Sequence, residues 1–125
     1  MVATARNVDA LSYLPDEPTR VLKLKLDVTS KDSIVKAVGD AVGKFGRLDA
    51  AVNNAGYTIM GDTEVVPEAD ARTLMETLFW GPVFLMQEVV RVFRDVNPQQ
   101  GGTVINMSSM GGTMTVGGNS FYHAG

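Results

Sequence analysis

Hydrophobic and polar residues follow two different periods along this chain, and the two periods alternate. In residues 22–28 leucines alternate with lysines and lead to a polar end, which is typical of a strand with one buried face. In residues 30–46 apolar side chains recur every three or four positions, which predicts an amphipathic helix. Thr29 or Ser30 is suited to cap this helix, and Gly46 is suited to end it.

The rest of the chain repeats this alternation of strand and helix patterns. Residues 1–5 form a short apolar run, and residues 47–56 form a near-continuous one, the pattern of a parallel strand covered on both faces. A long helical pattern covers residues 67–96, with a bend expected at 81–82, where glycine precedes proline. A further strand is expected over residues 102–109. We therefore predict a single α/β domain, residues 1–125, with a parallel sheet and right-handed crossovers.

Polar residues gather where three of these strands end. In parallel sheets ligands bind outside the carboxyl ends of the strands, so these residues are candidates for one site. They are Asp27 and Val28, then Asn53, Asn54, Ala55 and Gly56 in the stretch "VNNAG", and finally Ser108 and Ser109. Any one cluster alone is more simply interpreted as a turn after a strand. All three in this order favour a binding site.

Composition and charge exclude several classes of function. The 125 residues are 45% hydrophobic and 20% charged, which fits one globular domain rather than a disordered chain. A net charge of -3 provides no large basic field, so nucleic acid is not an expected partner. No apolar run reaches membrane-spanning length and no signal-peptide core is visible, so we expect no membrane span and favour a cytoplasmic location. Cysteine is absent, and no metal site is predicted.

The order of the polar clusters resembles that of the short-chain dehydrogenase/reductase family. In that family a strand ending in Asp-Val or Asp-Leu contacts adenine, an Asn-Asn-Ala-Gly segment lines the adenine ribose, and a serine precedes the tyrosine of a Tyr-x-x-x-Lys motif. Here Asp27-Val28, residues 53–56, Ser109 and Tyr122 follow the same order, and Ser109 lies 13 residues before Tyr122. The resemblance implies a partial Rossmann-like, doubly wound sheet that holds strands 2 to 5 of the family order.

The resemblance also implies a chemistry. Tyr122 would be the general acid or base that exchanges a proton with an alcohol or carbonyl substrate, and Ser109 would orient the substrate oxygen for hydride transfer with the cofactor. Arg6 matches the position where basic residues favour the 2′-phosphate of NADP, so NADP is expected rather than NAD. The alternatives are a turn serine, a half-buried aromatic residue and a solvated arginine.

Three departures from the family pattern accompany these matches. The chain opens at what resembles the second strand, without the first strand and its glycine-rich phosphate loop, so we expect a gap at the centre of the sheet and a truncated product. Residues 39–46, "GDAVGKFG", only imitate such a loop, because they lie within the helical pattern. The motif lysine would follow Gly125. Leu78 occupies the position where relatives carry an asparagine that helps hold a water of the proton relay.

Two functions are therefore weighed. The first is an NADP-dependent oxidoreductase that interconverts an alcohol and a carbonyl compound. The second is a catalytically inactive remnant that acts at most as an association partner, with homo-oligomer formation through residues 67–96. The substrate is not readable from the sequence. Four residues hint at an apolar pocket, although methionine fills cores more often than it contacts ligands. They are Met60, Trp80, Met110 and Met114.

Overall fold

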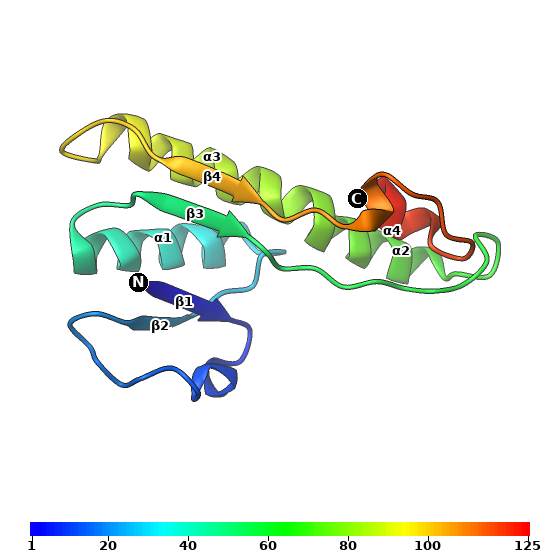
Figure 1. Ribbon diagram of the computed structural model, residues 1–125, viewed down its shortest axis with the longest axis horizontal. Coiled ribbons are helices and arrows are strands. Elements are labelled where there is room, and N and C mark those ends of the chain that lie inside the picture. The colour runs from blue at the N-terminus through cyan, green and yellow to red at the C-terminus, as the bar shows by residue number, and fades with distance from the viewer.

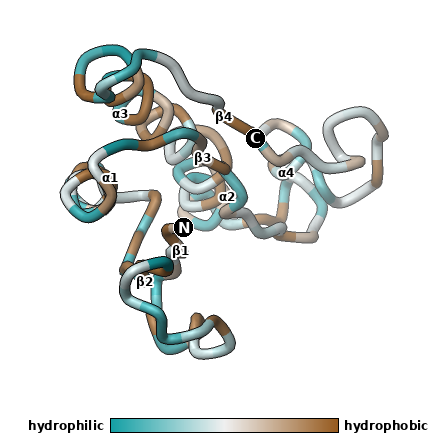
Figure 2. The backbone as a smooth tube through the Cα atoms, turned by 60° about the vertical axis from the view of Figure 1, so that its left-hand side comes forward, coloured by the Kyte–Doolittle hydropathy of each residue, from teal (hydrophilic) through white to brown (hydrophobic).

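Two separate pairs of parallel strands form the framework of the molecule (Figure 1). The computed structural model describes all residues from 1 to 125. Strand β1 (Val2–Ala5) pairs with β2 (Leu22–Lys25), and β3 (Ala50–Asn53) pairs with β4 (Thr103–Asn106). Both pairs are parallel, which confirms the expected partial Rossmann-like α/β fold. Apolar stretches on β1 and β4 are visible in brown in Figure 2.

Helix α1 (Lys31–Phe45) begins and ends where the sequence indicates. The Ser30 side chain accepts a hydrogen bond from the Ser33 amide at 3.3 Å, and Gly46 ends the helix at a φ of 77°, a conformation that favours glycine. The stretch 39–46 lies almost wholly within this helix, so its glycines do not form a phosphate loop.

The long helical pattern is interrupted by one turn of wider winding. Helix α2 (Glu68–Met75) continues through a π-helical turn, η2 (Glu76–Trp80), into helix α3 (Gly81–Asp95). Pro82 has no amide proton, so it cannot donate to the carbonyl four residues earlier, and the Gly81 amide instead reaches the Glu76 carbonyl. The bend expected at Gly81–Pro82 is therefore present as a π turn just before the proline.

The core lies between α1 and α3 and reaches the strands. Its buried residues are Ile34, Val38, Val89, Val92 and Phe93. Half-buried side chains from β3 and β4, Ala51 and Val104, pack against this cluster. The sheet that positions the candidate site thus rests on the face that α1 and α3 share.

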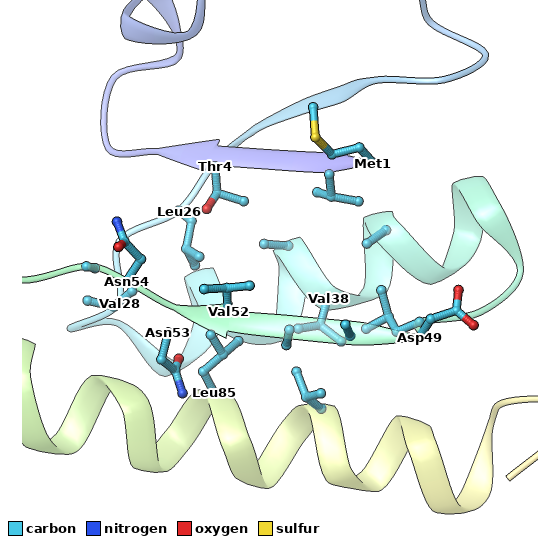
Figure 3. Close-up of a pocket in the computed structure, with 18 of the residues that line it drawn as sticks. Met1, Thr4, Leu26, Val28, Val38, Asp49, Val52, Asn53, Asn54 and Leu85 are labelled. Atoms are coloured by element: carbon cyan, nitrogen blue, oxygen red, sulfur yellow. The ribbon is translucent and has the colours of Figure 1, made fainter. Parts of the chain in front are cut away.

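The centre of the sheet is open. No hydrogen bonds join β1 to β3, and a cavity of about 770 Å³ lies between them, with a mainly apolar lining (Figure 3). We call it the central slot; Val2, Leu26, Ala51, Val52 and Leu85 are among its lining residues. The expected central gap is confirmed. The expectation that β3 is covered on both faces is wrong, because Val52 faces the slot and is 53% exposed.

Short elements complete the chain. They are the 3-10 turns η1 (Val8–Leu11) and η3 (Met110–Gly112) and the short helix α4 (Ser120–Ala124), which carries Tyr122. None of the helices has both the length and the apolar character needed to cross a membrane.

Candidate functional site

The arrows of β1, β3 and β4 point toward the same end of the molecule in Figure 1. The polar clusters that follow the strands therefore share one edge, as the sequence predicts. Each strand is shorter than its apolar pattern, so most of the candidate residues lie in the loops just beyond the strands rather than in them.

Asp27 is held as an ionised carboxylate at this edge. Its Oδ1 accepts hydrogen bonds from the Thr29 hydroxyl at 2.7 Å and from the Thr29 amide at 3.0 Å. These bonds, with a smaller contribution from the charge of Arg6, lower the pKa of Asp27 below its ordinary value. Arg6 is exposed, and no carboxylate lies within ion-pair distance of it, so its guanidinium is available to a ligand.

Val28 lies where the loop after β2 approaches helix α3. A Cβ placed at Gly81 would lie 3.1 Å from the Val28 side chain and carbonyl, so only glycine fits there without a shift. Val28 also lines the central slot. The structure thus uses this side chain for packing beside the edge of the site.

Asn53 and Asn54 point to opposite sides of the chain after β3 (Figure 3). Asn53 is buried and donates from Nδ2 to Asn106 Oδ1 at 2.7 Å. Asn54 is exposed and, with Ala55, lines the central slot. Asn106 was missed from the sequence, although its place at the end of the 102–109 strand pattern was a usable signal. It pairs in register with Asn53.

Leu78 separates the segment after β3 from the end of α4. A Cβ at Gly56 would lie 3.1 Å from Leu78 Cδ2, and one at Gly125 would lie 2.7 Å from Leu78 Cβ. The η2 turn thus directs an apolar side chain to the place where Gly56 and Gly125 approach each other. Leucine has no polar atom, so it cannot bind a water there.

Ser109 and Tyr122 meet at Gly111. The Ser109 hydroxyl accepts a hydrogen bond from the Gly111 amide at 3.3 Å, which caps the η3 turn. On its other side Gly111 faces the Tyr122 ring, since a Cβ there would lie 3.0 Å from Tyr122 Cε1. His123 Cδ2 lies at the same distance from that point. Glycine at 111 therefore allows the loop that carries Ser109 to reach the ring of Tyr122.

Two loops that the sequence left unassigned hold α4 in place. The Gly61 amide donates to the Gly118 carbonyl at 2.9 Å, and Thr58 Oγ1 donates to Asn119 Oδ1 at 3.0 Å. The hydroxyls of Thr63 and Ser120 lie 2.8 Å apart. No periodic signal in the sequence marks this pairing, because it joins residues about sixty positions apart through loop atoms.

Comparison with known proteins places these features in a common frame. A family model described as short chain dehydrogenase matches residues 1–125. Oxidoreductase calM of Penicillium decumbens is 40% identical over 99% of this chain, which covers 42% of the length of calM. The chain thus spans less than half of that relative.

Solved structures give the same frame. A short-chain dehydrogenase from Streptomyces avermitilis superposes with a TM-score of 0.83 at 34% identity, over 98% of this chain and 44% of that one. ElxO, solved with NADP bound, superposes with a TM-score of 0.86 at 24% identity, over 98% of this chain and 50% of its own, which shows a shared fold.

Proposed function

Because this chain belongs to the short-chain dehydrogenase family, we propose that it serves an oxidoreductase that interconverts an alcohol and a carbonyl compound with NADP(H). The observation that carries the proposal is the approach of the Ser109 loop and the Tyr122 ring at Gly111. A hydroxyl that can orient an oxygen and a phenol that can exchange a proton are thereby brought to one corner.

The roles of the two side chains follow from their chemistry. In the direction of oxidation, Tyr122 takes the proton of the substrate hydroxyl while Ser109 donates a hydrogen bond to the substrate oxygen. In the direction of reduction, Tyr122 returns that proton to the carbonyl oxygen. When bound, the nicotinamide cofactor accepts or supplies the hydride that leaves or reaches the substrate carbon.

The residues near β1 and β2 fit the adenosine half of NADP. Arg6 is exposed and unpaired, and a guanidinium binds phosphate through charge-assisted hydrogen bonds. Asp27 is kept ionised by Thr29, so it offers an acceptor for an amino group. Asn54, Ala55 and Gly56 leave exposed backbone and one free amide beside them. NADP bound to ElxO is consistent with this choice of cofactor.

The cofactor preference is testable on the chain itself with 2′,5′-ADP and 5′-AMP. We expect 2′,5′-ADP to bind about tenfold more tightly, because Arg6 forms charge-assisted bonds only with the 2′-phosphate. In Arg6→Ala this preference should disappear. Arg20→Ala is the matched control, since Arg20 is an exposed arginine in the loop before β2. Equal affinity of the two nucleotides for the unaltered chain would overturn the assignment of Arg6.

The reaction is testable by isotope transfer. We expect deuterium from the transferable position of labelled NADPH to appear on the alcohol carbon of a reduced ketone, detected by mass spectrometry. Tyr122→Phe should abolish this transfer, whereas Tyr13→Phe should not, because Tyr13 is 78% exposed and lies in the loop before β2. Transfer that persists in Tyr122→Phe would exclude the proposed role of this phenol.

A second function, association with another polypeptide, is favoured by the central slot. Both β1 and β3 present an edge without a partner strand, and the slot between them is mainly apolar. Such edges bind extended segments through backbone hydrogen bonds. Helix α3 adds exposed apolar side chains at Val90 and, just before it, Trp80. Homo-oligomer formation through residues 67–96 therefore stays a prediction beside the slot.

A further inference from the structure

Exposed apolar side chains gather in the two loops that flank Tyr122. Met60 is 71% exposed, Met110 77% and Met114 61%. We call these three residues the methionine rim. Four of the other exposed large apolar residues, Tyr57, Val65, Met107 and Val116, belong to the same two segments, 57–66 and 107–119. Large apolar side chains in such number on a surface indicate a place where something binds.

Hydrogen bonds hold the two segments together beside α4. The Gly61 amide, next to Met60, donates to Gly118, and the Met114 amide donates to the Met110 carbonyl at 2.8 Å. Gly111, which follows Met110, contacts the Tyr122 ring. The methionine rim is therefore positioned next to the proposed proton-transfer residue, and each of its members lies one to four residues from a contact that fixes its loop.

The charges around the rim exclude one class of ligand. No lysine or arginine occurs between Arg47 and Arg72, and none follows Arg94. The loop that carries Met60 instead contains two carboxylates, Asp62 and Glu64. A carboxylate or phosphate on the ligand would meet these acidic groups without a cation to pair with, which is unfavourable in a partly desolvated site.

We propose that the methionine rim binds the apolar body of the substrate, and that this substrate is a neutral, lipophilic alcohol or carbonyl compound rather than an anionic one. The inference rests on the proposed oxidoreductase function and adds a substrate class to it. Methionine suits this role because its unbranched, polarisable side chain adapts to flexible alkyl chains. Burial of the alkyl chain against the rim supplies the affinity, while Ser109 and Tyr122 address its oxygen.

The test uses the chain labelled with ¹³C at its seven methionine methyl groups. Titration with 1-decanol should shift the signals of Met60, Met110 and Met114 and leave those of Met75 and Met86 in place. Decanoate, which has the same alkyl length and a negative charge, should bind about tenfold more weakly. Met1 lines the central slot and reports binding there. Shifts at Met1 without shifts at the rim would overturn the proposal, as would equal affinity for decanoate.

A pair of variants separates rim binding from general stickiness. Met110→Gln should weaken 1-decanol binding by about threefold to tenfold, because one apolar contact is lost on an exposed side chain that supports no core. Val35→Gln should leave binding unchanged, since Val35 is an exposed apolar residue on α1. Equal effects of the two variants, or rim signals that move with protein concentration before decanol is added, would assign the rim to non-specific contact or to a second copy of the chain.

The same labelled sample distinguishes failure of this inference from failure of the proposed function. Titration with 2′,5′-ADP, followed at the backbone amides of Arg6 and Asp27, reports cofactor binding independently of the rim. Nucleotide binding without a decanol response refutes only the substrate class. Absence of both responses refutes the cofactor site and the substrate class together.

Discussion

Asp27 shows how one local turn sets the charge at the edge of the sheet. Two hydrogen bonds from Thr29 stabilise its carboxylate and lower its pKa. A group whose pKa is lower in the folded state than in the unfolded state, about 3.9 for aspartate, stabilises the fold above that value. This contribution is lost as the pH falls through the folded pKa. Since Asp27 lies near the surface, the contribution to stability is small, and its main consequence is a fixed negative charge.

The Thr29 hydroxyl is therefore predicted to control the titration of Asp27. Thr29→Val removes the side-chain donor but keeps the amide, so the pKa of Asp27 should rise toward its ordinary value. Thr29→Ser keeps both donors and should leave the pKa where it is. A titration of the ¹³C carboxyl signal measures both variants. An unchanged midpoint in Thr29→Val would show that the amide alone, or Arg6, sets the pKa.

Asn97 is predicted to be a main source of stability for the ends of β3 and α3. It is buried; its Oδ1 accepts from the Leu48 amide, and its Nδ2 donates to the carbonyls of Leu48 and Gly101. Asn97→Ala should lower the free energy of unfolding by about 2–4 kcal/mol, because it leaves several backbone groups without partners. Gln100→Ala, with one exposed hydrogen bond, should cost under about 0.5 kcal/mol. Urea denaturation measures both, and equal losses would contradict this role.

Helix α1 contains two glycines that no contact requires. A Cβ at Gly43 would have no neighbour within 4 Å, and the same holds for Gly39. Gly43→Ala should therefore stabilise the chain by about 0.5–1 kcal/mol through helix propensity. Gly46→Ala should destabilise it, because Gly46 has a φ of 77°. Thermal unfolding of the two variants checks the direction of each change. A loss of stability in Gly43→Ala would mean that residues 39–46 serve a purpose other than the helix.

The turn between α3 and β4 depends on a close approach of backbone to an aromatic ring. A Cβ at Gly102 would lie 2.5 Å from the ring of Phe93, a buried core residue. Gly102→Ala should thus cost about 1–3 kcal/mol, because either the ring or the entry to β4 must move. Gly101 is less informative, since its φ of 115° adds backbone strain to any substitution. Denaturation of Gly102→Ala that matches the unaltered chain would contradict the predicted steric conflict.

The central slot dominates the behaviour of the molecule as a whole. Two strand pairs lean on α1 and α3 but leave β1 and β3 without hydrogen bonds to each other (Figure 1). Unpaired, mainly apolar edges of this kind favour pairing with another chain. We therefore expect the isolated chain to associate reversibly at micromolar concentration or above.

This association is predicted to depend on the slot-facing side of β3. Val52→Lys places a charge in the slot and should reduce association in sedimentation velocity experiments. Val35→Lys is a matched control, because Val35 and Val52 are each 53% exposed but Val35 lies on helix α1. A monomeric chain that unfolds in one cooperative transition, or equal effects of the two lysines, would exclude the slot as the site of association.

Particular residues show where sequence-based prediction succeeded. Ser30 and Gly46 mark the limits of α1 because capping is a local interaction between neighbours. The alternation of apolar and polar residues predicted every strand, although each strand proved shorter than its pattern, since only partnered residues form ladders. The partnering of Asn53 with Asn106 and the position of Leu78 between Gly56 and Gly125 were not predictable, because they depend on how distant segments approach.

The sequence by itself determined the order of strands and helices, the parallel α/β class and the set of polar residues at the strand ends, because periodicity, caps and motif order are local properties of the chain. Only the tertiary structure decided which of these residues meet: Ser109 and Tyr122 at Gly111, Asp27 with Thr29 and Arg6, and the methionine rim beside α4. The physical reason is that such meetings depend on loop-to-loop hydrogen bonds and on close approaches that only glycine permits, neither of which leaves a periodic pattern in the sequence.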